Sequence, residues 1–315
     1  GDRIFLPLVG TQLPLLTYSK KDVSDDTEYP KLGGGITADV TVVRETKGGP
    51  LVGFFSAGLY SDGDLSGSED VFDDVNVYTD GTMNFYPGVI QQAWLRYQGV
   101  QAGVQQSKFD FISAGYNAFP GYSSRARTLA VNATKNFGDT SLSLSFEDSS
   151  VRDMDDGVIA NYEESFMVDP VLQFRGRHKN ALFHASAAIH RITFDGEDFG
   201  MDDEDSWGAA GQAGAMFEFR SKGDPKVKGD EELSRLMMSV SVAQGALGYL
   251  GMPDFAVDYT VNGDGNMDLS RGASGLVSYM HMLDERTKLA LTASGFWSKM
   301  TIDETQLVER SEIAF

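Results

Sequence analysis

Apolar and polar residues alternate in short segments along the whole chain. In residues 140–148, Leu142, Leu144 and Phe146 alternate with serines. A period of two places one set on each face of a β-strand. Segments of this kind end at Gly, Asn, Asp or Pro, and they predict an all-β protein of fourteen strands. The predicted strands cover residues 12–19, 34–45, 51–60, 89–98, 100–107, 125–135, 140–147, 166–177, 181–194, 207–220, 234–244, 271–283, 288–299 and 304–315.

The connections between these segments alternate between short and long. Short links lie near residues 46–50, 99, 136–139, 178–180 and 284–287, and an over-long member of this class covers 221–232. Long links lie at 20–33, 61–88, 108–124, 147–164, 195–206 and 245–271. A soluble Greek-key sandwich has alternating strands but needs no such rhythm. The rhythm predicts a transmembrane antiparallel β-barrel, one domain over residues 1–315, with long extracellular loops and short periplasmic turns.

The amino-acid composition argues against several classes of function. The 315 residues include 46 acids, 26 bases and no cysteine, which gives a net charge of -20. This balance argues against nucleic-acid binding, and the lack of cysteine excludes disulfides and thiolate sites. The mean hydropathy is -0.24, and the absence of an apolar run near ~20 residues excludes membrane-spanning helices.

The acidic residues concentrate in two long links. Residues 61–88 and 195–206 each contain seven acids and no base. Solvated loops explain such runs without special chemistry, while glycans, divalent cations or lipid headgroups are alternative partners for them. The sequence predicts no cofactor. Calcium bound among the acidic loops is the one alternative, and the fragment NGDGNMD at 262–268 lacks the glutamate that completes a calcium loop.

Aromatic residues lie near many strand ends, as in the interface girdles of membrane barrels. The predicted girdle residues are Tyr18, Tyr60, Tyr97, Phe137, Phe194, Trp207 and Trp297. Burial in a soluble core is the alternative interpretation of these side chains.

Residues 90–111, IQQAWLRYQGVQAGVQQSKFDF, resemble the hairpin before the inward-folded third loop of alphaproteobacterial general porins, the Brucella and rhizobial type. VGTQLPLLTYS resembles the first strand of that family, and VAQGALGYL resembles a later strand. The resemblance implies a sixteen-stranded barrel in the outer membrane of a Gram-negative bacterium. It also implies a homotrimer in contact with outer-membrane lipid and lipopolysaccharide.

The end of the sequence departs from the family pattern. TQLVERSEIAF is more similar to the antepenultimate strand of such porins than to the last one. Two further strands are therefore expected after Phe315, and the intact mass of the source protein should exceed 34.3 kDa.

The third loop, residues 107–125, is rich in glycine and aromatic residues and contains one acid, Asp110. It is expected to fold inward and narrow the pore, although a packed external loop or a trimer contact would also suit it. Charges on the loop and wall are expected to filter solutes by size and charge. The candidate constriction residues are Asp39, Arg96, Lys108, Asp110, Arg125, Glu147, Arg175 and Arg177. Arg177 alternatively meets lipid phosphates, and Lys108 alternatively caps a strand end.

The predicted function is passive diffusion of small hydrophilic solutes and ions through a porin, without catalytic or metal-binding residues. The sign of its ion selectivity stays open. An outer-membrane barrel enzyme, of lipase or protease type, is an alternative whose only hint is His190 near Asp195, since GxSxG and HExxH are absent. A secreted β-protein that binds calcium or glycans is another alternative, and solubility without detergent would distinguish it.

Overall fold

The computed structural model describes residues 3–5, 10–18, 30–63, 84–111, 124, 126–152, 167–194, 204–219, 234–251, 257–261, 267–282, 288–303 and 306–314. The chain divides into two compact units. Unit 1 comprises residues 1–98 and 103–105, and unit 2 comprises residues 99–102 and 106–315. Each unit is described by itself.

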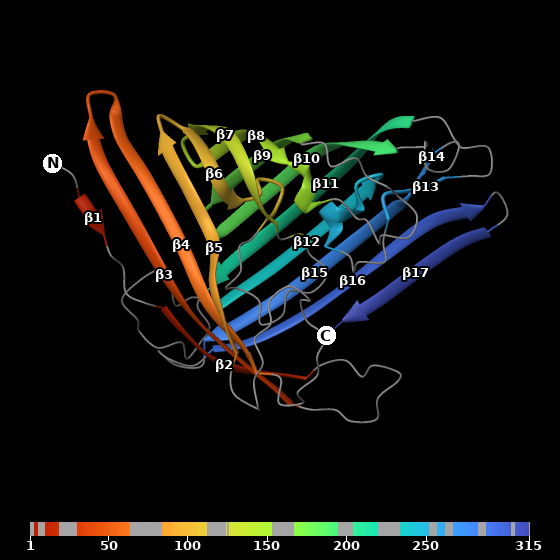
Figure 1. The fold of residues 1–315 in the computed structure, drawn as a ribbon, viewed down its shortest axis with the longest axis horizontal. Coiled ribbons are helices and arrows are strands. Elements are labelled where there is room, and N and C mark those ends of the chain that lie inside the picture. Colours follow the sequence, from red (N-terminus) through yellow and green to blue (C-terminus); the bar gives the residue numbers. More distant parts are fainter. Residues whose placement is uncertain are drawn as a thin grey trace. The chain divides into compact units, whose positions relative to one another are not determined.

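Unit 1 is an antiparallel sheet (Figure 1). β3 (Pro30–Thr46) pairs with β4 (Gly49–Gly63), and β4 pairs with β5 (Asn84–Tyr97). The short strands β1 (Arg3–Phe5) and β2 (Gly10–Tyr18) both pair with β3. At Gly48, in the tight turn between β3 and β4, a Cβ would lie 2.2 Å from the hydroxyl of Tyr97, so a larger residue there would require the Tyr97 side chain to move.

Unit 2 is also an antiparallel sheet, in which each strand pairs with the next strand of the series given below. β6 (Val100–Gln106) has residues in both units. The series comprises β7 (Arg127–Phe137), β8 (Thr140–Asp148), β9 (Val168–His178), β10 (Ala181–Phe194), β11 (Glu204–Phe219), β12 (Ser234–Gln244), β15 (Arg271–Met282), β16 (Lys288–Asp303) and β17 (Gln306–Ala314).

Four short elements lie in the described parts of the connections of unit 2. β13 (Tyr259–Val261) and β14 (Met267–Leu269) form a separate two-stranded sheet. Two 3-10 helices, η1 (Ser149–Val151) and η3 (Leu247–Leu250), follow β8 and β12. No helix in the described part of the chain is long and apolar enough to cross a membrane. The predicted all-β antiparallel fold is confirmed, and the strands lie close to their predicted positions.

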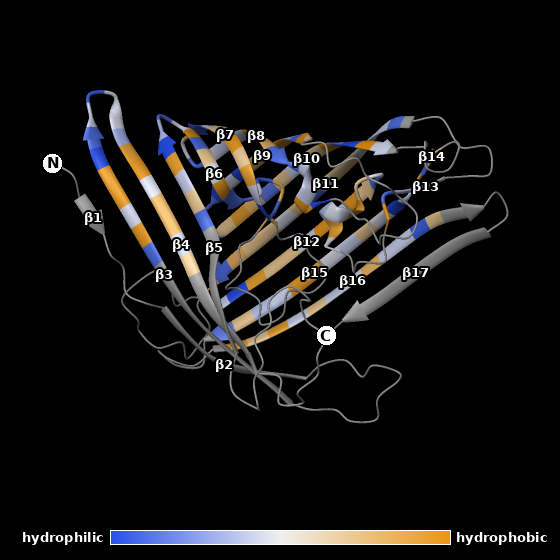
Figure 2. Cartoon of the chain, viewed as in Figure 1, coloured by the Kyte–Doolittle hydropathy of each residue, from blue (hydrophilic) through white to orange (hydrophobic). Residues whose placement is uncertain are grey.

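Strand register places like side chains in rows across unit 2. One row contains Thr134, Ser143, Gln173, Ser186, Gln212, Ser241 and Ser274, each opposite the next on neighbouring strands. The adjacent row, on the other face, contains Leu142, Phe174, Ala185, Ala213, Val240 and Gly275. We call the polar face the inner face and the apolar face the outer face. Figure 2 shows the resulting alternation of hydrophilic and hydrophobic residues along the strands.

In a soluble protein the apolar face of a strand is buried and the polar face is exposed. In unit 2 the polar face is buried and the apolar face is exposed. On β8 the side chains of Ser143 and Ser145 are 2% and 0% exposed, whereas those of Leu144 and Phe146 are 44% and 50% exposed. The same reversal occurs on β10, where Ser186 is buried and Ile189 is exposed. The strands of unit 2 therefore present apolar side chains outward and cover their polar ones.

Candidate functional site

The first residues of the third loop lie on the inner face of unit 2. The backbone N–H of Lys108 donates to Glu147 Oε1 on β8 at 2.7 Å. The carbonyl of Phe109 accepts from Ser186 Oγ on β10 at 2.7 Å, and that of Phe111 accepts from Arg175 on β9 at 2.8 Å. Polar side chains from three strands thus bind the loop backbone, and this explains why inner-face positions that look solvated in the sequence are buried.

Asp110 is the centre of the loop's own hydrogen bonds and is itself buried. Its Oδ2 accepts from Gln106 Nε2 at 2.6 Å and from the backbone N–H of Ala126 at 2.7 Å. Its Oδ1 accepts from the hydroxyl of Ser124 and from Arg152 Nη2, the latter at 3.0 Å. The carboxylate therefore joins both ends of the third loop and is paired with a cation.

Arg152 reaches this carboxylate from the connection after β8, and it was not predicted from the sequence. Burial acts to lower the pKa of Arg152, but attraction to Asp110 and the neighbouring groups leaves that pKa above its ordinary value. The guanidinium is therefore charged in the folded protein. Since Arg152 lies in a link without periodicity, nothing in the sequence points to its role.

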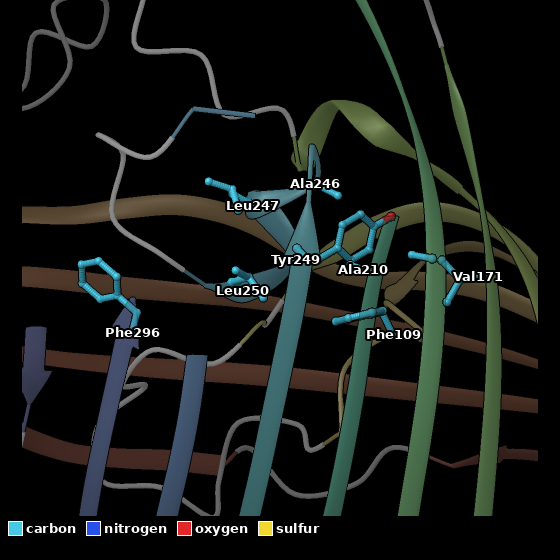
Figure 3. Packing of buried hydrophobic residues seen from close by; sticks show 10 residues of the cluster. Phe109, Val171, Ala210, Ala246, Leu247, Tyr249, Leu250 and Phe296 are labelled. Atoms are coloured by element: carbon cyan, nitrogen blue, oxygen red, sulfur yellow. The ribbon is translucent and has the colours of Figure 1, made fainter. Parts of the chain in front are cut away.

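A second segment, residues 246–251 around η3, also lies on the inner face. We call it the η3 segment. Its apolar side chains pack with Phe109 of the third loop and with wall residues of β9, β11 and β16, as Figure 3 shows. The ring of Tyr249 meets that of Phe109 edge-on, with 4.7 Å between the centroids. The buried members are Phe109, Val171, Ala188, Ala210, Ala243, Ala246, Leu247, Tyr249, Leu250 and Phe296.

A buried polar cluster lies beside the η3 segment. The hydroxyl of Tyr249 donates to Asp169 Oδ2 at 2.6 Å, and the same oxygen lies 2.9 Å from His190 Nδ1. His190 Nε2 lies 3.8 Å from Asp258 Oδ2. The acids near His190 in the described part of the chain are Asp169 and Asp258, and Asp195, which the sequence suggested, lies outside the described residues. Burial raises the pKa of Tyr249, and the negative charge of Asp169 raises it further, so Tyr249 keeps its proton.

This cluster is enclosed within the described part of unit 2. All four side chains are almost fully buried, so a substrate cannot reach them in this conformation. In the part of the chain that the structure describes, no group of three or more His, Asp and Glu side chains has the geometry to hold a metal ion.

Four of the predicted constriction residues come together in unit 2. Lys108, Asp110, Glu147 and Arg175 all lie where the third loop meets the wall. Arg177 instead forms an ion pair with Glu218 at 3.2 Å, close to the short turn between β9 and β10.

The other predicted constriction residues lie elsewhere. Asp39 and Arg96 belong to unit 1, where Asp39 is half-buried opposite Ser56 and Arg96 is exposed with its guanidinium 5.7 Å from the Trp94 ring. Arg125 lies outside the described residues.

Several predicted girdle aromatics are exposed at strand ends. Phe137, beside a short turn, is 59% exposed, and Trp207, beside a long link, is 61% exposed. Tyr97 is also exposed, and Trp297 is half-buried. The side chains of Tyr18, Tyr60 and Phe194 lie outside the described residues.

Comparisons with known proteins agree with this arrangement. No protein-family model and no curated protein matches the sequence. Among solved structures, the outer membrane channel DcaP of Acinetobacter baumannii superposes with a TM-score of 0.64 at 14% identity. The match covers 95% of this chain and 79% of DcaP. The chain has the fold of an outer-membrane β-barrel channel.

Two weaker matches are also outer-membrane proteins. A loop L8 deletion mutant of OmpT, an outer membrane protein of Vibrio cholerae, matches with a TM-score of 0.48 at 9% identity, over 99% of this chain and 86% of that one. Salmonella typhi OmpF matches with a TM-score of 0.35 at 11% identity, over 99% and 89% of the two chains.

Proposed function

We propose that the protein is a general-diffusion porin of the Gram-negative outer membrane. It would pass small hydrophilic solutes and ions through a water-filled pore narrowed by the third loop. The observation that carries this proposal is the reversed burial of unit 2, where alternate apolar side chains are exposed and alternate polar ones are covered.

The exposed apolar side chains of the outer face favour a membrane over water as the surroundings of unit 2. Burying a Leu, Val or Phe side chain stabilises a soluble protein by about 1.5–3 kcal/mol, so leaving many exposed on one face is unfavourable in water. Contact with lipid removes that penalty. Within lipid, only a closed sheet can provide hydrogen-bond partners for all of the backbone N–H and C=O groups of its strands. The exposed outer-face residues include Leu129, Val131, Leu142, Leu144, Phe146, Leu172, Phe174, Phe183, Ile189, Val240, Val242, Val277 and Leu291.

The inner face supports weak, unspecific passage of solutes. One of its rows, from Thr134 to Ser274, consists of serine, threonine and glutamine, which form hydrogen bonds without holding a solute strongly. Lys108 and Arg175 are only partly buried beside the third loop, and we propose that they contribute positive charge to the constriction. Asp39, Arg96, Arg125, Glu147 and Arg177 remain proposed members of the same charged set, and the protein would act without catalysis.

We also propose that the protein assembles as a homotrimer and contacts outer-membrane lipid and lipopolysaccharide. A groove of about 850 Å³ on unit 2 supports close contact with an apolar partner, because small residues line it between exposed apolar ones. Ala185 is opposite Ala213, and Gly275 is opposite Gly295, with Val240 on β12 between the two pairs. The alphaproteobacterial general porins remain the family that the sequence segments favour.

Reconstitution in planar bilayers tests the function. Stepwise conductance should appear, in multiples of three if trimers insert, and the reversal potential in a salt gradient would give the ion selectivity. A purified protein that stays monodisperse without detergent, or one that inserts without conducting, would contradict the proposal.

A further inference from the structure

We propose that Arg152 is a positioning residue that fastens the third loop to the η3 segment, and that the η3 segment is a second element narrowing the channel. This inference rests on the proposed function as a porin. It concerns three connections of unit 2 that lie far apart in the sequence, after β6, after β8 and after β12.

The guanidinium of Arg152 contacts both segments at once. Its Nη2 lies 3.0 Å from Asp110 Oδ1, and its Nη1 donates to the hydroxyl of Ser124, both in the third loop. The same Nη1 donates to the carbonyl of Gly248 at 3.2 Å, in the η3 segment. A planar fork of donors can bind several acceptors in fixed directions, which a lysine ammonium cannot reproduce.

Aromatic contacts strengthen this connection. The guanidinium carbon lies 4.5 Å from the ring centroid of Tyr249 and 6.0 Å from that of Phe109. Tyr249 belongs to the η3 segment and Phe109 to the third loop, so the cation lies against one ring from each. Cation–π attraction is strongest where water is excluded, as it is here.

The η3 segment crosses the inner face of the sheet. At one side the hydroxyl of Tyr249 reaches Asp169 on β9, and at the other the carbonyl of Leu250 accepts from Ser274 on β15 at 2.8 Å. Four strand spacings separate β9 from β15, or about 19 Å at ~4.8 Å each. A segment fixed at both of these strands covers β10, β11 and β12, so it occupies space next to the pore wall.

The contact with Arg152 leaves no room for a side chain at Gly248. A Cβ at this position would lie 1.9 Å from the backbone carbonyl oxygen of Arg152, and backbone cannot move away as a flexible side chain can. The close approach of the two connections therefore requires glycine at this point.

The test compares the full-length protein with the double variant Asp110→Asn/Arg152→Gln in planar bilayers. Removing both charges breaks the fastening without leaving a buried charge unpaired, so the barrel should still fold. The double variant and the single variant Gly248→Ala should both show a higher single-channel conductance than the wild type. The control is Arg191→Gln, which removes an arginine from an exposed ion pair with Asp205 and should leave conductance unchanged.

Hydrogen exchange of residues 246–251, measured by mass spectrometry in detergent micelles, is the second readout. Faster exchange there in the double variant, with wild-type exchange in the strands, would support the fastening. Unchanged conductance in both variants of a conducting protein, or unchanged exchange in residues 246–251, would overturn the inference. A wild-type protein that does not conduct would instead refute the porin function, and with it the narrowing role.

Discussion

Arg152 and Asp110 form a buried ion pair. Arg152 Nη2 lies 3.0 Å from Asp110 Oδ1, and the two side chains are 3% and 0% exposed. The lone acid of the third loop therefore does not present an isolated negative charge to the pore. Its charge is balanced by a residue 42 positions later in the sequence, and this balance determines how substitutions there should behave.

Asp110→Asn should destabilise the protein by about 3–5 kcal/mol, because it leaves the Arg152 cation buried without its partner. The uncompensated positive charge should also shift the reversal potential toward anion preference. Urea unfolding in lipid and a salt-gradient measurement check the two effects. The double variant Asp110→Asn/Arg152→Gln should recover much of the stability and return the reversal potential toward the wild-type value. Additive losses in the double variant would contradict the pairing.

The effect of Leu144→Lys on stability should show whether the outer face contacts lipid or water. Leu144 lies in the middle of β8 on the outer face, and a lysine at the midplane of a bilayer costs about 2–4 kcal/mol. On a protein surface in water the same change would alter stability by no more than about 0.5 kcal/mol. The free energy of unfolding from lipid vesicles measures the effect, with Leu144→Ile as the apolar control. A lysine variant as stable as the control would count against lipid contact.

Gly248→Ala should disturb the η3 segment although it adds only a methyl group. The added Cβ would lie 1.9 Å from a backbone oxygen, so one of the two connections has to move. The matched control is Gly211→Ala on β11, where a Cβ would lie 3.8 Å from its nearest neighbour, the carbonyl oxygen of Ser186. Thermal unfolding should show a lower midpoint for Gly248→Ala than for the control, and equal midpoints would be the contrary result.

Tyr249 should make stability fall at high pH. Burial raises its pKa above the ordinary value of 10.0, so above pH 10 the unfolded chain loses this proton while the folded protein keeps it. The stabilisation is therefore complete below pH 10 and declines as the pH rises, by up to about 1.4 kcal/mol per pH unit. The decline in urea midpoint between pH 9 and pH 11 should be smaller for Tyr249→Phe than for the wild type. Equal slopes would show that Tyr249 ionises in the folded protein.

The strands, their two faces and the alternation of short and long links could all be predicted from the amino-acid sequence. These properties are local, because a period of two depends only on neighbouring residues. Leu142, Leu144 and Phe146 therefore identify an apolar face whatever the strand pairs with, although whether that face meets lipid or a soluble core depends on its surroundings.

The contacts between side chains on the inner face could not be predicted, because they depend on how the sheet is assembled. Arg152 with Gly248, and Tyr249 with Asp169, are separated by 96 and 80 positions, and they lie in or beside links that have no periodicity. Their contacts depend on where the sheet places the ends of β8, β9 and β12, which no local pattern specifies. A buried ion pair requires two particular side chains to meet at one point in space. An apolar strand face requires only an apolar environment of any kind. The apolar face could therefore be predicted from the sequence, and the ion pair could not.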